Sequence, residues 1–204
     1  LRERKDLGLH TEMFTDGVMH MIQSGHVTGE KKTLHHRKVA SSIIMGSKAL
    51  YDFIDHNEMI EMYPVNHMND PYVIGQNDRM VSINSCLEID LYGQVASEAI
   101  GLEQFSGTGG QVDYLRGAKR SRGGRSILAF TSTAKGGTVS RIVPVLPPGA
   151  TVTSGRNEVD YIATEYGAVR LRGLTLRERA LALVSIAHPD FRPGLMAVVE
   201  ERFS

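Results

Sequence analysis

Hydrophobic and polar positions along the chain form short blocks that predict strands and helices in turn. A short apolar segment at residues 8–13 is followed by a helix-like run from Val18 to Gln23. The run Lys38–Met45 is rich in β-branched and small residues, which is typical of a buried parallel strand. The further strands are expected at 59–63, 80–89, 127–131, 139–145 and 161–164, and the further helices at 47–57, 72–76, 113–118, 176–187 and 193–203.

Turn and cap residues separate these blocks. Thr15 or Asp16 is placed to cap the first helix, and Gly25 is placed to end it. The segment Asn66–Pro71 is expected to be a loop, because Asn, Asp and Pro favour turns. The segment Thr175–Glu178 has the spacing of a capping box, in which the threonine and the glutamate each satisfy a backbone N–H.

Alternating strands and helices indicate an α/β fold with a largely parallel sheet. The region 80–164 is richer in strands, so we expect a mixed sheet. The length of 204 residues allows one large domain or two small ones, and the whole range 1–204 is interpreted as one.

Composition and charge narrow the class of protein. The chain is 41% hydrophobic and 23% charged, with a formal net charge of zero, which argues against a general nucleic-acid or membrane-surface binder. The single cysteine, Cys86, excludes an internal disulfide and fits a reducing cytoplasm. Cys86 lies in an apolar segment and is therefore expected to be a buried, inert side chain.

Glu12 lies where the first strand gives way to the first helix. In open α/β enzymes, ligands bind beyond the carboxyl ends of the strands, so a carboxylate at this position is a candidate for chemistry. On position alone, a solvated loop acid is the commoner case.

The densest glycine stretch, Ser106–Gly110, precedes an expected helix. Its backbone amides could approach a phosphate, helped by the helix N-terminus, or could surround an oxyanion in acyl chemistry. A flexible hairpin with no ligand explains the same glycines, and the residues alone leave these alternatives open.

Two other groups of residues are assigned no site. The basic segment Arg116–Arg125 is interpreted as a solvated loop rather than an RNA site, since it lacks interleaved aromatic residues. His10, Glu12, His35 and His36 match no standard zinc spacing, so no metal site is expected.

Several motifs together resemble one known family. The chain is similar, over essentially its whole length, to the C-terminal half of the acetyl-CoA hydrolase/transferase family, and most of all to its 4-hydroxybutyrate CoA-transferase branch. The motifs that carry the resemblance are, in order, Leu9–Met13, Asn69–Pro71, Glu88–Val95, Ser106–Gly110, Thr164–Gly167 with Leu171–Gly173, and Ala187–Arg192.

The resemblance implies a fold and roles. The implied fold is of the CoA-transferase type, an open, mostly parallel or mixed α/β sheet flanked by helices. The family's glutamate nucleophile corresponds to Glu12, and an asparagine beside the active site corresponds to Asn69. The family's contacts with coenzyme A correspond to the glycine-loop residues Ser106, Gly107, Gly109 and Gly110 and to Lys135.

The resemblance also implies partners. The N-terminal half of family members supplies part of the coenzyme A site, and the chain begins Leu1–Asp6 without an initiation sequence, so we expect a C-terminal piece that is inactive alone. Coenzyme A is implied as a substrate, with no tightly bound cofactor. Acyl-CoA and short-chain carboxylates are the expected substrates, and the full-length enzyme is expected to be a cytoplasmic homodimer without nucleic-acid or membrane partners.

Three functions are compatible with these residues. The first is a CoA-transferase acting on acids such as acetate, butyrate or 4-hydroxybutyrate through a glutamyl-CoA thioester. The second is an acyl-CoA hydrolase, which differs in admitting water to the intermediate. The third is a non-catalytic CoA-binding module, in which Glu12 would face solvent.

Overall fold

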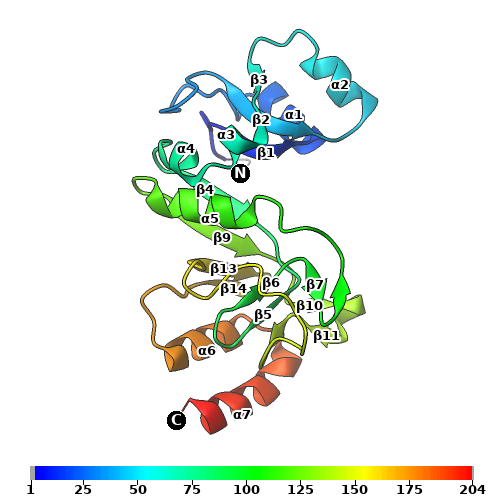
Figure 1. Cartoon of the computed structure of the whole chain (residues 1–204), viewed down its shortest axis with the longest axis vertical. Helices are drawn as coiled ribbons and strands as arrows, with labels where there is room; N and C mark the ends of the chain where they lie inside the picture. The colour runs from blue at the N-terminus through cyan, green and yellow to red at the C-terminus, as the bar shows by residue number, and fades with distance from the viewer. Residues whose placement is uncertain (1–2, 204) are drawn as a thin grey trace. The chain divides into compact units, whose positions relative to one another are not determined.

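The computed structural model describes residues 3–203 and divides the chain into two compact units, whose elements are labelled in Figure 1. Unit 1 comprises Leu1–Met80 and Arg116–Gly124, and unit 2 comprises Val81–Leu115 and Arg125–Ser204. Each unit has its own hydrophobic core. Within residues 3–203, no helix is both long and apolar enough to cross a bilayer.

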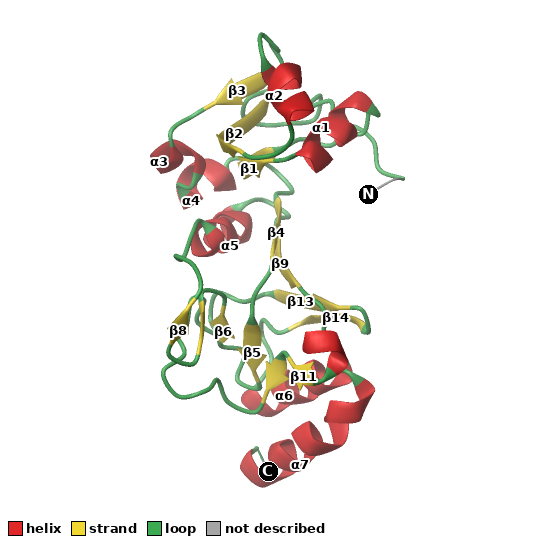
Figure 2. Cartoon of the chain, turned by 90° about the vertical axis from the view of Figure 1, so that its right-hand side faces the viewer, coloured by secondary structure: helices red, strands yellow, loops and turns green. Residues whose placement is uncertain are grey.

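Unit 1 is built on a three-stranded parallel sheet in the order β1-β2-β3, as the alternation of strands and helices predicted. The strands are β1 (His10–Phe14), β2 (Val39–Ile44) and β3 (Ile60–Met62). Helices follow the strands along the chain (Figure 2), namely α1 (Asp16–Gln23), α2 (Lys48–Ile54), α3 (Val65–Met68) and α4 (Pro71–Gly75).

The start of α1 differs from the sequence prediction. Thr15 makes no capping hydrogen bond through its side chain, and the Asp16 carboxylate accepts hydrogen bonds from the backbone N–H and hydroxyl of Ser47. Ser47 in turn caps α2, because its hydroxyl accepts from the N–H of Leu50. Asp16, the first residue of α1, thus links the start of α1 to Ser47 at the start of α2. The end of α1 is as predicted, since Gly25 follows it with a φ of +74°.

The segment Asn66–Pro71 is not entirely a loop, because Val65–Met68 forms the helical turn α3. Pro64 starts this turn, and its carbonyl accepts from the N–H groups of His67 and Met68. Met68 is fully buried and anchors the turn in the unit. The composition of the segment favoured a loop, because composition does not show that the side chain of Met68 is buried in the core of the unit.

Unit 2 contains a four-stranded sheet in the order β14-β13-β9-β4. Its strands are β4 (Val81–Asn84), β9 (Arg125–Ala129), β13 (Tyr161–Thr164) and β14 (Gly167–Arg170). The first three are parallel and β14 is antiparallel, so the prediction of a mixed sheet is confirmed. Smaller sheets join β12 (Ile142–Val143), β5 (Glu88–Asp90) and β6 (Val95–Ala96), β7 (Ala99–Ile100) and β8 (Glu103–Gln104), and β10 (Thr133–Ala134) and β11 (Val139–Ser140).

The single strand expected over 80–89 is broken between β4 and β5. The guanidinium of Arg141 donates to the main-chain carbonyls of Cys86 and Leu87, so these carbonyls are withdrawn from any strand ladder. Arg141 also interrupts the strand expected over 139–145, which is split into β11 and β12. Cys86 lies in the connection rather than in a strand, and burial raises its pKa to about 12, as expected of an inert thiol.

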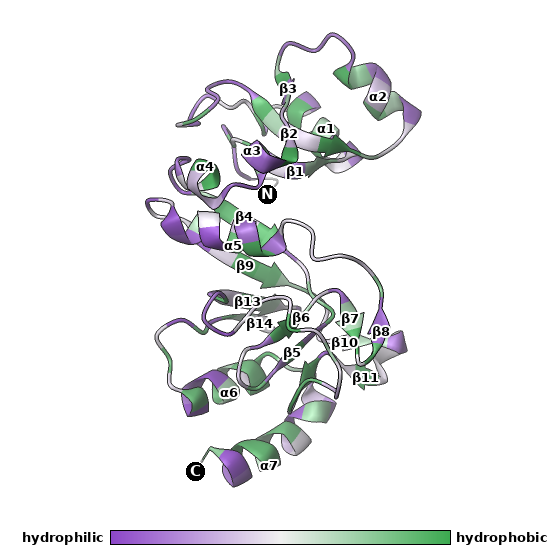
Figure 3. Cartoon of the chain, viewed as in Figure 1, coloured by the Kyte–Doolittle hydropathy of each residue, from purple (hydrophilic) through white to green (hydrophobic). Residues whose placement is uncertain are grey.

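The helices of unit 2 pack its core. The capping box at the start of α6 (Leu176–Ser185) is confirmed, with Thr175 and Glu178 each accepting from the other's backbone N–H. In α7 (Arg192–Arg202) the middle is hydrophobic and the last turn polar (Figure 3). The buried side chains of this core include Ile89, Leu128, Ile162, Leu183 and Val199.

The basic segment Arg116–Arg125 is not a continuous loop, because α5 (Gln111–Arg120) extends into it. Two of its arginines have partners within unit 1. The guanidinium of Arg120 lies 5.6 Å from the ring centre of Tyr72, and Arg122 forms an ion pair with Asp78. These contacts favour the structural interpretation of the segment.

Candidate active site

Glu12 is the central residue of β1, whereas the sequence predicted it at the end of the strand, and hydrogen bonds hold its backbone to the neighbouring strand. The hydroxyls of Ser41 and Ser42 on β2 both donate to the main-chain carbonyl of Glu12, each over 3.1 Å. The side chain is half-buried rather than solvated. Glu12 is therefore held on a rigid element, as a catalytic group needs to be.

Asn69 makes the hydrogen bond that defines the site. Its Nδ2 donates to Glu12 Oε2 over 3.1 Å. Asn69 directly follows α3, and its own N–H bonds to the carbonyl of Val65 over 2.8 Å. Among residues 3–203, the other carboxylate oxygen, Glu12 Oε1, makes no hydrogen bond or ion pair. The structure thus brings together the two residues that the sequence assigned to catalysis and leaves one oxygen available to attack.

His10 is a part of this site that the sequence singled out only as an improbable metal ligand. Its Nε2 lies 2.9 Å from the main-chain carbonyl of Met68, and because a carbonyl only accepts, Nε2 carries the proton. The ring is 5% exposed, and burial lowers its pKa to about 4. His10 is accordingly neutral at physiological pH. Its position two residues before Glu12 on a strand was the available signal.

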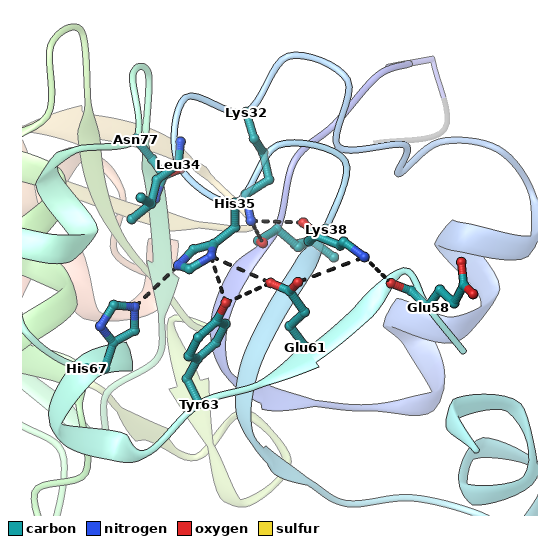
Figure 4. Close-up of polar contacts among 10 residues, drawn as sticks. Lys32, Leu34, His35, Lys38, Glu58, Glu61, Tyr63, His67 and Asn77 are labelled. Carbon is teal, nitrogen blue, oxygen red and sulfur yellow. Dashed lines mark hydrogen bonds and ion pairs between the residues drawn. The ribbon is translucent and has the colours of Figure 1, made fainter. Parts of the chain in front are cut away.

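A polar cluster lies beside these residues in unit 1 and consists of His35, Glu61, Tyr63 and His67, which we call the His35 cluster (Figure 4). The Tyr63 hydroxyl lies 2.8 Å from Glu61 Oε2 and 3.0 Å from His35 Nδ1. His35 Nε2 lies 3.3 Å from His67 Nε2. Burial lowers the pKa of His35, helped by the positive charge of Lys32, which keeps the imidazole neutral.

Lys32 ties the starts of two strands together. Its ammonium donates to the carbonyl of Leu9 over 2.7 Å and to that of Lys38 over 2.9 Å. Burial lowers the pKa of Lys32 to about 8. The two carbonyls lie immediately before β1 and β2, so Lys32 supports the strand that carries Glu12.

The predicted coenzyme A loop belongs to unit 2. The N–H groups of Phe105 and Ser106 both bond to the carbonyl of Glu98, which fixes the start of the loop. Gly107 and Gly109 are exposed, and a Cβ at either would meet no atom within 4 Å. Gly110 is buried, and its carbonyl accepts from the N–H of Tyr114 within α5. The loop is therefore open to a ligand that approaches its backbone.

Lys135 belongs to unit 2 as well, in the short 3-10 turn Lys135–Gly137, and is exposed. Three residues before the turn, Ser132 donates from its N–H over 2.8 Å and from its hydroxyl over 2.7 Å to the carboxylate of Glu165. Burial acts to raise the pKa of Glu165, but the hydrogen bonds from Ser132 outweigh it and the pKa is lowered. The sequence did not single out Ser132 for a role.

Within residues 3–203, no group of three or more His, Cys, Asp or Glu side chains could hold a metal ion. His10 and His36 bond instead to main-chain carbonyls, those of Met68 and Glu30.

Comparison with known proteins places this geometry in a family. A 4-hydroxybutyrate coenzyme A transferase of Clostridium kluyveri is 55% identical over 203 residues, covering 100% of this chain and 47% of that protein. A succinyl-CoA:cyclohexane-1-carboxylate CoA transferase of Geobacter metallireducens is 51% identical over 96% of this chain and 45% of its own length. The chain therefore spans about half the length of the curated relatives it matches.

Solved structures show the same fold. A 4-hydroxybutyrate CoA-transferase from Porphyromonas gingivalis is 62% identical and superposes with a TM-score of 0.85 over 98% of this chain and 46% of its own. RipA from Yersinia pestis is 44% identical with a TM-score of 0.94, over 100% and 46% of the two chains. The predicted CoA-transferase-type fold is confirmed. The family model for the acetyl-CoA hydrolase/transferase C-terminal domain matches residues 46–199, and the chain belongs to that family.

Proposed function

We propose that this chain supplies the nucleophile of a CoA-transferase that moves coenzyme A between a short-chain acyl-CoA and a carboxylic acid. The observation that carries the proposal is the Glu12 carboxylate, restrained through Oε2 by Asn69 while Oε1 is left without a partner among the described residues. A carboxylate held in this way is suited to covalent catalysis rather than to forming an ion pair.

The proposed reaction begins with attack of a Glu12 oxygen on the acyl carbon of the acyl-CoA. The C–S bond breaks, and an acyl-glutamyl anhydride and the CoA thiolate form. The thiolate then attacks the glutamyl carbon of the anhydride, the C–O bond to the acyl group breaks, and the first carboxylate leaves. A glutamyl-CoA thioester remains on the enzyme. A second carboxylate takes the coenzyme A by the reverse steps, so no proton, oxidant or water is consumed.

The names of the relatives favour transfer over hydrolysis. The proteins that are 55%, 51% and 46% identical are all named CoA transferases, and the last is a probable butyrate:acetyl-CoA coenzyme A-transferase. A protein named acetyl-CoA hydrolase, from Yarrowia lipolytica, is 28% identical. We therefore favour 4-hydroxybutyrate, butyrate or acetate as the acceptor acids.

Ser106, Gly107, Gly109, Gly110 and Lys135 stay predictions for the contacts with coenzyme A, supported by the open backbone of the glycine loop. The same proposal includes three further points. The enzyme is cytoplasmic, it is a homodimer, and it also needs the N-terminal half found in the family's proteins.

The decisive experiment is mass spectrometry of the full-length enzyme after incubation with acyl-CoA. We expect a coenzyme A adduct on the peptide that carries Glu12, and Glu12→Gln should abolish the adduct and reduce turnover by several orders of magnitude. Asp55→Asn, a change of an exposed carboxylate in the same unit, should retain the adduct. More than a tenth of wild-type activity in Glu12→Gln would overturn the assignment of the nucleophile.

Product analysis separates the transferase from the hydrolase. With added acetate, a transferase forms acetyl-CoA at the expense of the donor, and double-substrate kinetics should give parallel reciprocal plots. Release of free coenzyme A at the same rate with and without acetate would instead support the hydrolase. No adduct and no turnover of any acyl-CoA would leave only the CoA-binding module.

A further inference from the structure

We propose that His10 and His67 are positioning residues for the nucleophile, which act by holding residues 67–69 so that Asn69 stays hydrogen-bonded to Glu12. The inference rests on the proposed function of Glu12. It assigns a role to two histidines whose side chains contact the segment and cluster around Asn69, His10 through the carbonyl of Met68 and His67 through His35.

The first support is a pair of parallel contacts between β1 and the end of α3. His10 and Glu12 are two residues apart on one strand and therefore point to the same side. They bond to two consecutive residues, His10 Nε2 to the carbonyl of Met68 over 2.9 Å and Glu12 Oε2 to Nδ2 of Asn69 over 3.1 Å. Any shift of the Met68 carbonyl therefore also moves the amide that restrains Glu12.

Burial makes the first of these contacts strong. His10 is 5% exposed and Met68 is fully buried. A buried carbonyl that loses its donor is destabilised, since no water replaces the lost hydrogen bond. The His10 contact therefore resists displacement of the backbone just before Asn69.

The second support is the hydrogen-bond order within the His35 cluster (Figure 4). Tyr63 donates its hydroxyl proton to Glu61, so its oxygen accepts the proton of His35 Nδ1. His35 Nε2 is then an acceptor, and the 3.3 Å contact is a donation from His67 Nε2–H. His67 is thus held by a chain of groups whose donors all point in one direction.

The two supports converge on three consecutive residues. His67 is fixed through its side chain, Met68 through its carbonyl and Asn69 through its contact with Glu12. The helix α3 has four residues, too few to be stable without tertiary contacts. Side-chain contacts from β1 and the His35 cluster therefore set the position of Asn69.

The test uses two variants of His10 in the full-length enzyme. His10→Leu removes the donor to Met68 and keeps an apolar side chain, whereas a glutamine in His10→Gln can donate its Nε2–H to the same carbonyl. His20→Leu, a change of an exposed histidine on α1, is the control. Asparagine is labelled with ¹⁵N, and the side-chain amide signal of Asn69 is identified by its loss in Asn69→Asp.

We expect His10→Leu to shift the Asn69 amide signal and speed its hydrogen exchange, and to lower kcat about ten- to a hundredfold with little change in KM. His10→Gln should retain most of the wild-type signal and rate, and His20→Leu should be unchanged. His67→Leu should move the same amide signal, which keeps the test available if His10→Leu does not fold.

An unmoved Asn69 signal in both His10→Leu and His67→Leu would overturn the inference. So would a moved signal with unchanged kcat, because the histidines would then support the fold without positioning the nucleophile. Failure of the proposed function has a different signature, since Glu12→Gln would then retain turnover even where the Asn69 signal responds to the histidine variants.

Discussion

Asn69 donates from Nδ2 to Oε2 of Glu12 over 3.1 Å, although 57 residues separate the two along the chain. Asn69 Oδ1 is buried and, within the described residues, has no hydrogen-bond partner. The side-chain amide of Asn69 thus bonds only through its NH₂ group. This orientation is favourable, because the opposite one would place the amide oxygen against the carboxylate of Glu12, which would repel it. The contact restrains one oxygen of the proposed nucleophile without neutralising its charge.

Asn69→Ala should lower kcat by about ten- to a hundredfold, since a hydrogen bond to a charged group contributes about 1.5–3 kcal/mol. Steady-state kinetics of the full-length enzyme measure this, with Asn66→Ala, an exposed change in the short helix that precedes Asn69, as the control. Asn69→Asp should be worse than Asn69→Ala, because it places a second carboxylate against Glu12. Equal rates for Asn69→Ala and the wild type would show that the contact has no role in turnover.

Gly107→Val tests the predicted coenzyme A loop. Gly107 lacks a positive φ, and a Cβ there meets nothing within 4 Å, so the substitution should leave the melting temperature within about 2 °C. If a ligand approaches the loop backbone closely, the valine should nevertheless weaken binding of coenzyme A at least about tenfold.

Gly155→Val is the matched control for Gly107→Val, because Gly155 is also exposed and also has open space. Isothermal titration with coenzyme A compares the two variants in the full-length enzyme. Equal Kd values for Gly107→Val and Gly155→Val would favour a loop that does not contact the ligand.

The sequence predicts the position of Glu12 because that position is local. The pattern predicts a strand followed by a helix, and β1 and α1 are there, although β1 continues two residues beyond Glu12 to Phe14. The hydrogen bond with Asn69 is not local, and only the resemblance to a family brought the two residues together beforehand. The sequence considered His10 only as a metal ligand, because its partner is a main-chain carbonyl, which no side-chain motif reveals.

The errors in the elements have the same origin. The strand expected over 80–89 ends early because Arg141, more than 50 residues away, binds the carbonyls of Cys86 and Leu87. The turn α3 was expected to be a loop because Asn66 and Asn69 suggest one, whereas burial of Met68 decides otherwise. The periodicity of hydrophobic residues indicates which face of a strand or helix is buried. It does not show where a side chain from a distant part of the sequence ends that strand or helix.

Lys32→Met should destabilise unit 1, because it removes the donor to the partly buried carbonyls before β1 and β2. The difference from the wild type should also depend on pH. The pKa of Lys32 is about 8 in the folded state, below its ordinary value of 10.5, so unfolding takes up a proton between these values. The stability of the wild type relative to Lys32→Met should therefore rise by about 3 kcal/mol as pH increases from 8 to 10.5.

Urea unfolding of both proteins at pH 7.5, 9 and 10 would measure this difference, where the pH values are chosen to bracket the folded pKa of about 8. Lys31→Met is the control, since Lys31 is exposed and pairs with Asp6 at the surface. A constant difference between the wild type and Lys32→Met across this range would show that Lys32 is not desolvated in the folded protein.

The last prediction concerns His10 at acid pH. Burial lowers its pKa from 6.5 to about 4, and the neighbouring charges of Lys32, His35 and His67 act in the same direction, whereas the hydrogen bond to Met68 opposes them. Unfolding therefore takes up a proton between pH 6.5 and 4. The stability contributed by neutral His10 is fully present above pH 6.5 and should fall by about 3 kcal/mol as the pH drops to 4.

His10→Gln isolates this contribution, because glutamine can keep the bond to Met68 but does not titrate. The wild type should lose stability relative to His10→Gln as the pH falls through this window, measured by urea unfolding and, locally, by hydrogen exchange of the N–H of Asn69. Turnover should fall over the same window only in the wild type, since a charged His10 disturbs the backbone that carries Asn69. Parallel pH curves for the two proteins would mean that the imidazole is solvated in the folded state, and that it cannot hold Met68 as the 2.9 Å contact indicates.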